Sequence, residues 1–277
     1  MIERPRRPGP SVRTRVDEIT EERVRTREDR LATEEPLEIR LAWPGSPARR
    51  VWVTMRTPGH DFELAAGWLR HESLIGDEHI SGVAYCTDVD LDPEQEFNVV
   101  TVTLAAPPLH HPGHRHETQS TGSSACGVCG KDSVAAALTV TAAERWAGPL
   151  PEPSVVRRLP EVLRTQQQVF ERTGGVHAAG LFTADGTALV IREDVGRHNA
   201  VDKVTGARVL AGASPAEACL VVSGRAGFEL VQKAIASGVG ALAAVGAPTS
   251  LSVDLAREAG LTLYGFTSED RTVRYSG

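Results

Sequence analysis

Two cysteines three positions apart are the residues in this sequence best suited to covalent chemistry. Cys126 and Cys129 stand in the run Ser-Ser-Ala-Cys-Gly-Val-Cys-Gly-Lys, directly before an Ala-rich helix predicted over residues 132–140. The N-terminus of that helix and the ammonium group of Lys131 both favour thiolate over thiol, and the thiolate is the nucleophilic form of cysteine. The pair is therefore predicted to accept a sulfur atom from a partner's persulfide or to attack a disulfide.

Three other uses of the cysteine pair stay open on spacing alone. A zinc site needs about four ligands, and His110, His111, His114 and His116 could supply the others, but these histidines lie in a tract typical of a flexible linker. A thioredoxin-like oxidoreductase would place its C-x-x-C in a strand-then-helix unit, whereas this pair follows a linker. A structural pair without chemistry is the third. Sulfur transfer fits the surroundings best, and no metal site is predicted.

Polar residues follow several predicted strands in the second half of the chain. The junctions are residues 192–199, 223–225, 247–250 and 266–271. The first three precede predicted helices, whose N-terminal N–H groups suit phosphate. Gly196 and Gly224 let the backbone approach a ligand, while Arg197 and Arg225 can bind phosphate oxygens.

Two carboxylates beside these junctions have a predicted role as well. Glu193 and Asp194 could accept hydrogen bonds from a base edge or from ribose hydroxyls. Caps and ion pairs around ordinary loops remain an alternative at any one junction. Neither a Walker A sequence nor G-x-G-x-x-G follows a strand, which argues against a standard ATPase or a Rossmann dehydrogenase.

Composition limits the class of protein. The 277 residues are 41% hydrophobic and 24% charged, with a formal net charge of -6, which argues against general attraction to nucleic acid or an anionic membrane. No apolar run approaches the ~20 residues of a membrane helix, and the arginine-rich N-terminal segment lacks the apolar stretch expected of a secretory signal. We therefore expect a cytoplasmic protein without a nucleic-acid or membrane partner. Of the remaining cysteines, Cys219 is predicted to be buried, and nothing around Cys86 indicates activation.

The chain divides into four predicted zones: a disordered charged tail over 1–34, a small N-terminal α/β domain over 35–106, a mobile linker with the C-x-x-C and its helix over 107–150, and a larger domain over 151–277. In the small domain, alternating apolar residues predict strands at Leu37–Leu41, Val51–Thr54 and Val99–Leu104. A helix is predicted to begin after Pro58-Gly59.

The larger domain is predicted to alternate strands and helices. One amphipathic helix is expected over residues 153–172, then a hairpin with its turn at Ala184-Asp185-Gly186. Strands at 219–223, 241–245 and 261–266 are separated by helical patterns, one of them over 226–237. This order predicts a mainly parallel sheet covered on both faces, with ligands outside the carboxyl ends of its strands.

With these residues in hand, the chain resembles the formate dehydrogenase accessory sulfurtransferases, the FdhD family. The likeness runs from about residue 35 to 277. It rests on several stretches in the same order: residues 56–67 (R-T-P-G-H-D-F-E-L-A-A-G), 126–130, 174–179, 193–203 (E-D-V-G-R-H-N-A-V-D-K), 223–225 and 248–250.

The resemblance implies a sulfurtransferase. It would take persulfide sulfur from a cysteine desulfurase and pass it to the molybdenum (or tungsten) bis-guanine-dinucleotide cofactor before that cofactor enters the formate dehydrogenase catalytic subunit. Cys126 would carry the persulfide and Cys129 would assist. The resemblance also implies a homodimer and a cytidine deaminase-like α/β/α fold for the larger domain. A non-catalytic chaperone that hands over the same cofactor is the alternative.

The resemblance also implies where the cofactor, or a guanine nucleotide as its analogue, would bind. The segment near the C-terminus associated with binding corresponds to Phe266, Thr267, Ser268, Glu269, Asp270 and Arg271, and the predicted site is completed by His177, Gly196, Arg197, His198, Ser223, Gly224 and Arg225. The family commonly carries an additional arginine in that segment. This chain has Ser268 with Glu269 and Asp270 beside it, and two carboxylates repel phosphate unless they turn outward.

Deamination is excluded by the same residues. A zinc deaminase needs H-x-E, and this chain has alanine at the glutamate position in His177-Ala178-Ala179. No proline precedes Cys126, and the cysteine pair comes before the histidine instead of after it. His177 is predicted either to contact the ligand or to pack in the core.

Overall fold

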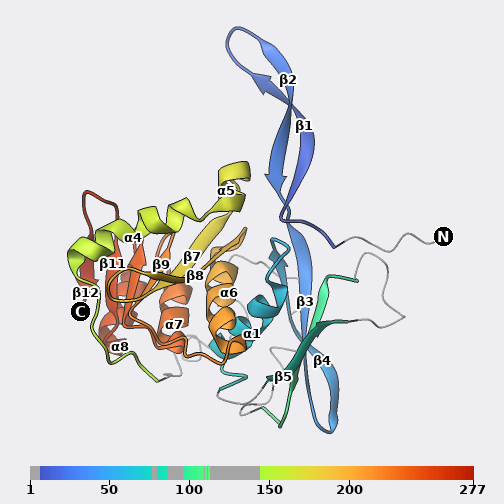
Figure 1. Ribbon diagram of the computed structural model, residues 1–277, viewed down its shortest axis with the longest axis vertical. Coiled ribbons are helices and arrows are strands. Elements are labelled where there is room, and N and C mark those ends of the chain that lie inside the picture. Colours follow the sequence, from blue (N-terminus) through green and yellow to red (C-terminus); the bar gives the residue numbers. More distant parts are fainter. Residues whose placement is uncertain (1–6, 77–79, 87–95, 109, 111, 113–143) are drawn as a thin grey trace, which may run out of the picture.

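A computed structural model describes residues 7–76, 80–86, 96–108, 110, 112 and 144–277 (Figure 1). Cys126, Cys129, the predicted helix over 132–140 and most of the predicted linker lie outside the described residues. The described strands form three sheets of two, four and six strands. The division into domains stays a prediction.

The four-stranded sheet belongs to the N-terminal half and has the order β4-β3-β6-β5. Its strands are β3 (Glu35–Trp43), β4 (Ser46–Arg56), β5 (Ile80–Tyr85) and β6 (Val99–Leu104). Alternate residues such as Leu37, Ile39 and Leu41 point inward and are fully buried. Helix α1 (Asp61–His71) covers them with Leu64 and Leu69. The three strands and the helix predicted in this half are confirmed.

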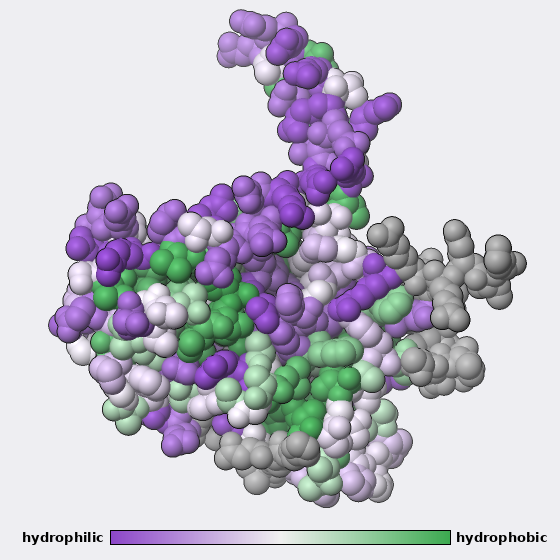
Figure 2. Space-filling model, viewed as in Figure 1, coloured by the Kyte–Doolittle hydropathy of each residue, from purple (hydrophilic) through white to green (hydrophobic). Residues whose placement is uncertain are grey.

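The two-stranded sheet contradicts the prediction of a disordered tail over 1–34. Strands β1 (Ser11–Ile19) and β2 (Val24–Ala32) pair along their full length and form an arm that stands away from the body (Figures 1 and 2). Two features make this charged segment pair. β-Branched residues recur in both strands, and opposite charges meet across the ladder. Arg13 and Glu28 form an ion pair of 3.1 Å, and Thr26 donates to Asp17 at 2.7 Å.

The six-stranded sheet forms the centre of the C-terminal half, in the order β12-β11-β10-β9-β7-β8. Its strands are β7 (His177–Phe182), β8 (Ala188–Asp194), β9 (Cys219–Val222), β10 (Ala241–Ala244), β11 (Thr262–Gly265) and β12 (Val273–Ser276). The predicted hairpin is confirmed as β7 and β8. The expected mainly parallel sheet is wrong, because only the pairings of β10 with β9 and with β11 are parallel. The hairpin and the final turn into β12 reverse the chain, so the sheet is mixed.

Helices cover both faces of this sheet, as predicted (Figure 1). One face packs against α4 (Pro153–Thr165), and the other packs against α6 (Arg197–Leu210), α7 (Phe228–Ser237) and α8 (Ser250–Ala259). The single helix predicted over 153–172 is instead two, because α4 ends and α5 (Gln168–Thr173) begins separately. The carboxylate of Glu193 accepts hydrogen bonds from the N–H groups of Val169 and Phe170, at 2.9 and 2.8 Å, which fixes the start of α5.

The two halves meet where α1 crosses α6 at close range. A β-carbon placed on Gly67 would overlap the carbonyl of Asp202, and one on Gly206 would overlap the carbonyl of Glu63. The two backbones therefore approach each other through glycine. No helix within the described part of the chain is long and apolar enough to cross a membrane.

Candidate functional site

The carboxyl ends of four strands meet at one edge of the six-stranded sheet. Strands β9, β10 and β11 run in parallel, and β8 runs the same way because β7 is antiparallel to both β8 and β9. We call this the strand-end edge, defined by His177, Gly196, Arg197, His198, Ser223, Gly224, Arg225 and residues 266–271. The edge gathers all the described residues predicted to bind the cofactor.

Hydrogen bonds between neighbouring loops fix this edge. The hydroxyl of Ser223 accepts from the N–H of Ala178 at 2.9 Å, which joins the start of β7 to the end of β9. The N–H of Gly246 donates to the carbonyl of Gly224 at 2.9 Å, and the N–H of Phe266 donates to the carbonyl of Gly246 at 3.1 Å. The loops after three successive strands therefore form one continuous surface.

Gly224 lies at the centre of the edge, beside His177 and Arg197. A β-carbon at Gly224 would lie 3.5 Å from Nδ1 of His177 and 3.9 Å from Cδ of Arg197, so any longer side chain would press on them. Burial, and then the Arg197 guanidinium, lower the pKa of His177. The half-buried imidazole is therefore neutral at pH 7 and lies at the strand-end edge, not in either core cluster.

Arg197 and Arg225 place two cations on the edge. Among the described residues, neither guanidinium forms an ion pair with a carboxylate. Arg197 begins α6, whose N-cap is Gly196, and Arg225 precedes α7, whose N-cap is Gly227. Neither N-cap supplies a side-chain hydrogen bond, so the first N–H groups of both helices have no acceptor from the capping side chain. Cations beside helix N-termini that have no side-chain cap suit an anion.

The next junction is different because its helix is capped internally. The side chain of Thr249 accepts from the N–H of Ser252, and the Ser252 hydroxyl accepts from the N–H of Thr249 at 2.9 Å. This capping box satisfies the N-terminus of α8. Of the three helices expected to offer N–H groups to phosphate, α6 and α7 have no side-chain cap, and α8 has one.

His198 lies one residue into α6 and is held by α7. Its Nε2 lies 3.0 Å from Oε2 of Glu229. Burial lowers the pKa of His198 to about 3, with Lys233 and Arg197 adding to the shift. The imidazole is therefore neutral over the physiological range, and the charge at the start of α6 comes from Arg197.

The loop after β11 is hydrogen bonded to α4 through Arg157. Phe266 has a positive φ of 50° and is 40% exposed, and the Arg271 guanidinium carbon lies 5.3 Å from the centre of its ring. Arg157 donates to the carbonyls of Glu269 and Asp270 at 3.3 and 3.4 Å. The two carboxylates are exposed, whereas the side chain of Thr267 is buried and hydrogen bonds to Thr272.

The two carboxylates that precede α6 serve the fold and do not face a ligand. Glu193 starts α5, as described above. Asp194 is fully buried, pairs with Lys203 at 2.6 Å and accepts from the N–H groups of Gly196 and Thr57 at 2.8 and 3.1 Å. The prediction that Glu193 and Asp194 bind a base or ribose is therefore wrong.

Asp194 and Lys203 are half of a larger buried junction, which we define as Arg56, Asp61, Asp194 and Lys203. Arg56 is 0% exposed and pairs with Asp61 at 3.0 and 3.1 Å. Lys203 also donates to the carbonyl of Thr57 at 2.9 Å. The junction joins residues 56–61 to residues 194–203. Sequence reasoning missed this role, and no local pattern in either segment was a signal for it, because the contacts join residues more than 130 positions apart.

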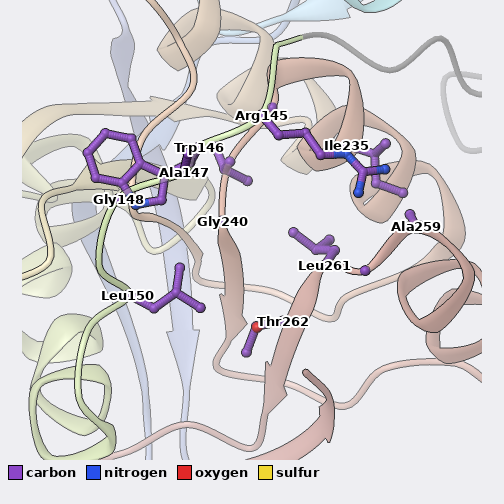
Figure 3. Close-up of a pocket in the computed structure, with 13 residues that line it drawn as sticks. Arg145, Trp146, Ala147, Gly148, Leu150, Ile235, Gly240, Ala259, Leu261 and Thr262 are labelled. Carbon is purple, nitrogen blue, oxygen red and sulfur yellow. The ribbon is translucent and has the colours of Figure 1, made fainter.

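A cavity of about 210 Å³ lies elsewhere, at the opposite end of the same strands (Figure 3). Trp146, Leu150 and Leu261 line it together with Arg145 and Thr262. Thr262 begins β11, whereas the site residues follow the end of that strand. The cavity is therefore separate from the strand-end edge.

The two described cysteines are accounted for. Cys219 is fully buried, and burial raises the pKa of its thiol to about 12, which confirms the predicted inert residue. The Cys86 sulfur lies 3.7 Å from Nη1 of Arg40. Within the described ranges, no three His, Cys, Asp or Glu side chains are grouped to hold a metal ion.

Comparisons with known proteins match almost the whole chain. A family model described as FdhD/NarQ family matches residues 32–277. "Sulfur carrier protein FdhD" of Streptomyces avermitilis is 48% identical over 261 residues, covering 92% of this chain and 89% of the relative. The protein of the same name from Mycobacterium tuberculosis is 45% identical over 270 residues, covering 92% and 93%.

A solved structure shares the fold. It is that of a candidate formate dehydrogenase accessory protein from Desulfotalea psychrophila, with a TM-score of 0.72 over 96% of this chain and 97% of that one. At 22% identity this likeness concerns the fold alone. The family match and the relatives together confirm the resemblance seen in the sequence: the chain belongs to the FdhD/NarQ family.

Proposed function

We propose that this chain carries sulfur from a cysteine desulfurase to the molybdenum or tungsten bis-guanine-dinucleotide cofactor of formate dehydrogenase, in the cytoplasm and as a homodimer. The names of its relatives support the sulfur-carrying role, and the description of the matched structure supports the link to formate dehydrogenase. The observation that carries the proposal is the pair of guanidinium groups of Arg197 and Arg225, which form no ion pair with any described carboxylate and lie beside two uncapped helix N-termini at one sheet edge.

The substrate's phosphates fit the charge of this edge. Guanidinium groups bind phosphate oxygens through two parallel hydrogen bonds, and free N–H groups at helix N-termini add further donors. Gly224 keeps the loop between them low enough for a phosphate to approach. The exposed ring of Phe266, with Arg271 beside it, offers a flat surface on which a purine can stack.

The acidic residues of the C-terminal segment do not oppose this assignment. Arg157 holds the carbonyls of Glu269 and Asp270, while the carboxylates themselves are exposed. Water screens exposed charges strongly, so their repulsion of a phosphate is weaker than that of buried carboxylates. The three-layer packing of α4, the six-stranded sheet and α6 to α8 supports the cytidine deaminase-like description of this half.

Cys126 supplies the covalent step in this proposal. Its thiolate attacks the outer sulfur of the donor's persulfide, a new sulfur–sulfur bond forms on Cys126, and the donor's own sulfur–sulfur bond breaks to release a thiolate. The outer sulfur then bonds to the metal of the substrate as the bond to Cys126 breaks. The electron pair of the broken bond stays on Cys126 as a thiolate, and the reduced metal of the substrate supplies the two electrons that convert the transferred sulfur to bound sulfide, so the metal is oxidised by two electrons. Cys129 assists as the neighbouring thiol.

Mass spectrometry separates the sulfur carrier from the alternative, a chaperone that only hands over the cofactor. The full chain is incubated with a cysteine desulfurase and cysteine. We expect the peptide with Cys126 to gain the mass of one sulfur atom, and Cys126→Ala to abolish both this gain and the maturation of formate dehydrogenase. Cys86→Ala is the matched control and should change neither. Normal maturation with Cys126→Ala would rule the relay out.

A further inference from the structure

Helices α6 and α7 are joined by three polar contacts that the proposed function leaves unused. Each contact pairs one side chain of α6 with one of α7, and together they form what we call the α6–α7 ladder. Its rungs, measured between the nearest nitrogen or oxygen atoms, are His198–Glu229 at 3.0 Å, Asp202–Lys233 at 2.6 Å and Thr205–Ser237 at 3.0 Å. The rungs recur at about one turn of each helix, so they lie on the two helix faces that meet. The last two, which we call the distal rungs, lie farther from the strand-end edge.

His71, the last residue of α1, connects the distal rungs. Its Nδ1 lies 2.5 Å from Oδ1 of Asp202, and its Nε2 lies 2.7 Å from the hydroxyl of Ser237. The imidazole is 1% exposed. It reaches both helices because α1 crosses α6 at the close approach of Gly67 and Gly206, and α1 also contacts α7. Three neighbouring helices therefore share one buried polar cluster within packing that is otherwise apolar (Figure 1).

The protonation states of this cluster follow from its burial and its charges. Burial lowers the pKa of His71, and the opposing effect of Asp202 does not restore it, so the imidazole is neutral at pH 7. Burial alone would raise the pKa of Asp202, but Lys233 and His71 outweigh burial and lower it, so the carboxylate is ionised. The imidazole then donates from Nδ1 to Asp202 and accepts at Nε2 from the Ser237 hydroxyl, whose oxygen accepts from Thr205. This order leaves the distal rungs without net charge and gives each hydrogen bond one direction.

Oδ1 of Asp202 is the atom at which the three helices meet. His71 and Lys233 both bond to it, whereas the other oxygen, Oδ2, is buried and accepts no hydrogen bond from any residue that the structure describes. A buried ion pair with an unsatisfied acceptor is not the most stable packing, because apolar side chains of similar volume often stabilise a helix interface as well or better. Its contacts are directional, however. Apolar contacts permit two helices to slide along each other, whereas a hydrogen bond weakens steeply with distance and angle.

The direction of the two helices makes their axial register important for a ligand. Strands β8, β9 and β10 run the same way, so α6 and α7, which connect them, run parallel to each other and begin at the strand-end edge. Arg197 is the first residue of α6, and Arg225 precedes Gly227, the N-cap of α7. A slip of one residue between the helices would move the two guanidinium groups by about 1.5 Å relative to each other. The same slip would break the 2.6 Å contact of Asp202 with Lys233.

We propose that the distal rungs and His71 position Arg197 and Arg225 for the ligand, because they hold α6 and α7 in the register in which both guanidinium groups reach one diphosphate. The inference rests on the proposed function, since it concerns the same phosphate site. His71, Asp202 and Ser237 are too buried to contact a ligand, so they act through the helices. A role in stability alone makes a different prediction, because the affinity for GDP would then follow the stability of each variant.

Two variants of the Asp202–Lys233 rung, made in the full chain, separate positioning from stability. Lys233→Met leaves the buried carboxylate without its cation, so the midpoint of urea denaturation should fall. Adding Asp202→Asn removes the uncompensated charge, so stability should recover, but the ion pair that fixes the register stays absent. We expect isothermal titration calorimetry to give a dissociation constant for GDP raised about fivefold in both variants. Affinity that returns together with stability would show a structural role alone and overturn the proposal.

Ser237→Ala tests the last rung without changing any charge. Ser237 is the final residue of α7, at the opposite end of the helix from Arg225, and its loss should raise the dissociation constant for GDP about threefold. Val231→Ala is the matched control, because Val231 is a fully buried core residue of the same helix and is outside the ladder. This control should lose more stability than Ser237→Ala but bind GDP within about twofold of the unaltered chain. Far-UV circular dichroism checks that both variants are folded under the conditions of the titration.

Arg225→Ala connects the ladder to the edge. With one arginine left, the relative position of the pair no longer matters, so adding Lys233→Met and Asp202→Asn should weaken GDP binding by less than about a further twofold. The proposal is overturned if these two substitutions weaken binding equally with and without Arg225, or if they leave affinity unchanged while Arg225→Ala lowers it. In both cases the phosphate site itself stands. Unchanged affinity in Arg225→Ala alone would instead refute that site, and this inference with it.

Discussion

The segment Glu193–Lys203 contributes residues to both the buried junction and the strand-end edge. The two sites differ in whether their charged side chains are buried and paired with an opposite charge. In the junction, Lys203 and Asp194 lie 2.6 Å apart and are 1% and 0% exposed. At the edge, Arg197 has no carboxylate partner among the described residues and begins a helix without a capping side chain. Fewer than two turns of α6 thus separate a charge that joins the two halves from a charge that has no carboxylate partner among the described residues.

The difference shows that one shared motif can have two physical roles. Charged groups that are buried need partners, because an unpaired buried charge is costly. Charged groups that bind a ligand must lack strong partners in the free protein, because an internal ion pair would compete with the ligand. Substitutions in the junction should therefore change stability, and substitutions at the edge should change binding.

Lys203→Met should have the largest effect. It removes the cation from a buried pair and leaves the Asp194 carboxylate without compensation, which costs about 3–5 kcal/mol of unfolding free energy. Urea denaturation of both proteins measures the difference. Arg225→Met is the control from the edge and should change stability by less than about 0.5 kcal/mol. Equal destabilisation by the two variants would remove the distinction between junction and edge.

Arg197→Ala with Arg225→Ala should give the next largest effect, on binding alone. Each charge-assisted hydrogen bond to a phosphate is worth about 1.5–3 kcal/mol, so the dissociation constant for GDP should rise at least roughly tenfold. Isothermal titration calorimetry measures it. Arg172→Ala, an exposed arginine on α5, is the matched control. Unchanged GDP affinity in the double variant would place the nucleotide elsewhere.

The edge was predictable from the sequence, and the junction was not. The residues that follow β8, β9 and β11 could be placed together because parallel strands end at the same edge of a sheet. The partners of Asp194 lie up to 137 residues away in the chain, at Thr57, and no local pattern indicates such a contact. For this reason the sequence led to a ligand-binding role for Asp194, whereas in the structure its carboxylate binds Lys203 and the N–H of Thr57.

The remaining errors of fold prediction also have local causes. The arm was predicted to be disordered because its charge is high, although Arg13–Glu28 and similar cross-strand pairs offset the repulsion. The break between α4 and α5 depends on Glu193, which follows it by more than twenty residues. The predicted parallel sheet neglected the reversal that the β7–β8 hairpin imposes on its own neighbours.

The titration of His198 sharpens the comparison through the pH dependence of stability. Its pKa in the folded protein is about 3, below the ordinary value of 6.5, so between these limits the unfolded chain binds more protons. Unfolding free energy therefore falls as pH decreases from 6.5 towards 3, by up to about 1.4 kcal/mol per pH unit from this group. His198→Gln should have a shallower dependence in urea denaturation at stepped pH. Parallel curves would show that the imidazole is not held neutral.

The smallest effects should come from the helix caps. At the strand-end edge, the N-terminus of α8 has a side-chain cap, whereas those of α6 and α7 have none. Thr249→Ala removes the capping box of α8 and should cost about 1 kcal/mol of stability without changing GDP affinity.

Gly227→Ser adds a cap to α7, and its β-carbon would meet no atom within 4 Å. Stability should rise by only a few tenths of a kcal/mol. GDP should bind more weakly, because the serine hydroxyl then occupies an N–H group that the phosphate needs. Urea denaturation of Thr249→Ala and Gly227→Ser measures the change in stability, and calorimetry measures the change in GDP affinity. If the added cap leaves GDP affinity unchanged, the open start of α7 has no part in binding, and Arg225 acts through its charge alone.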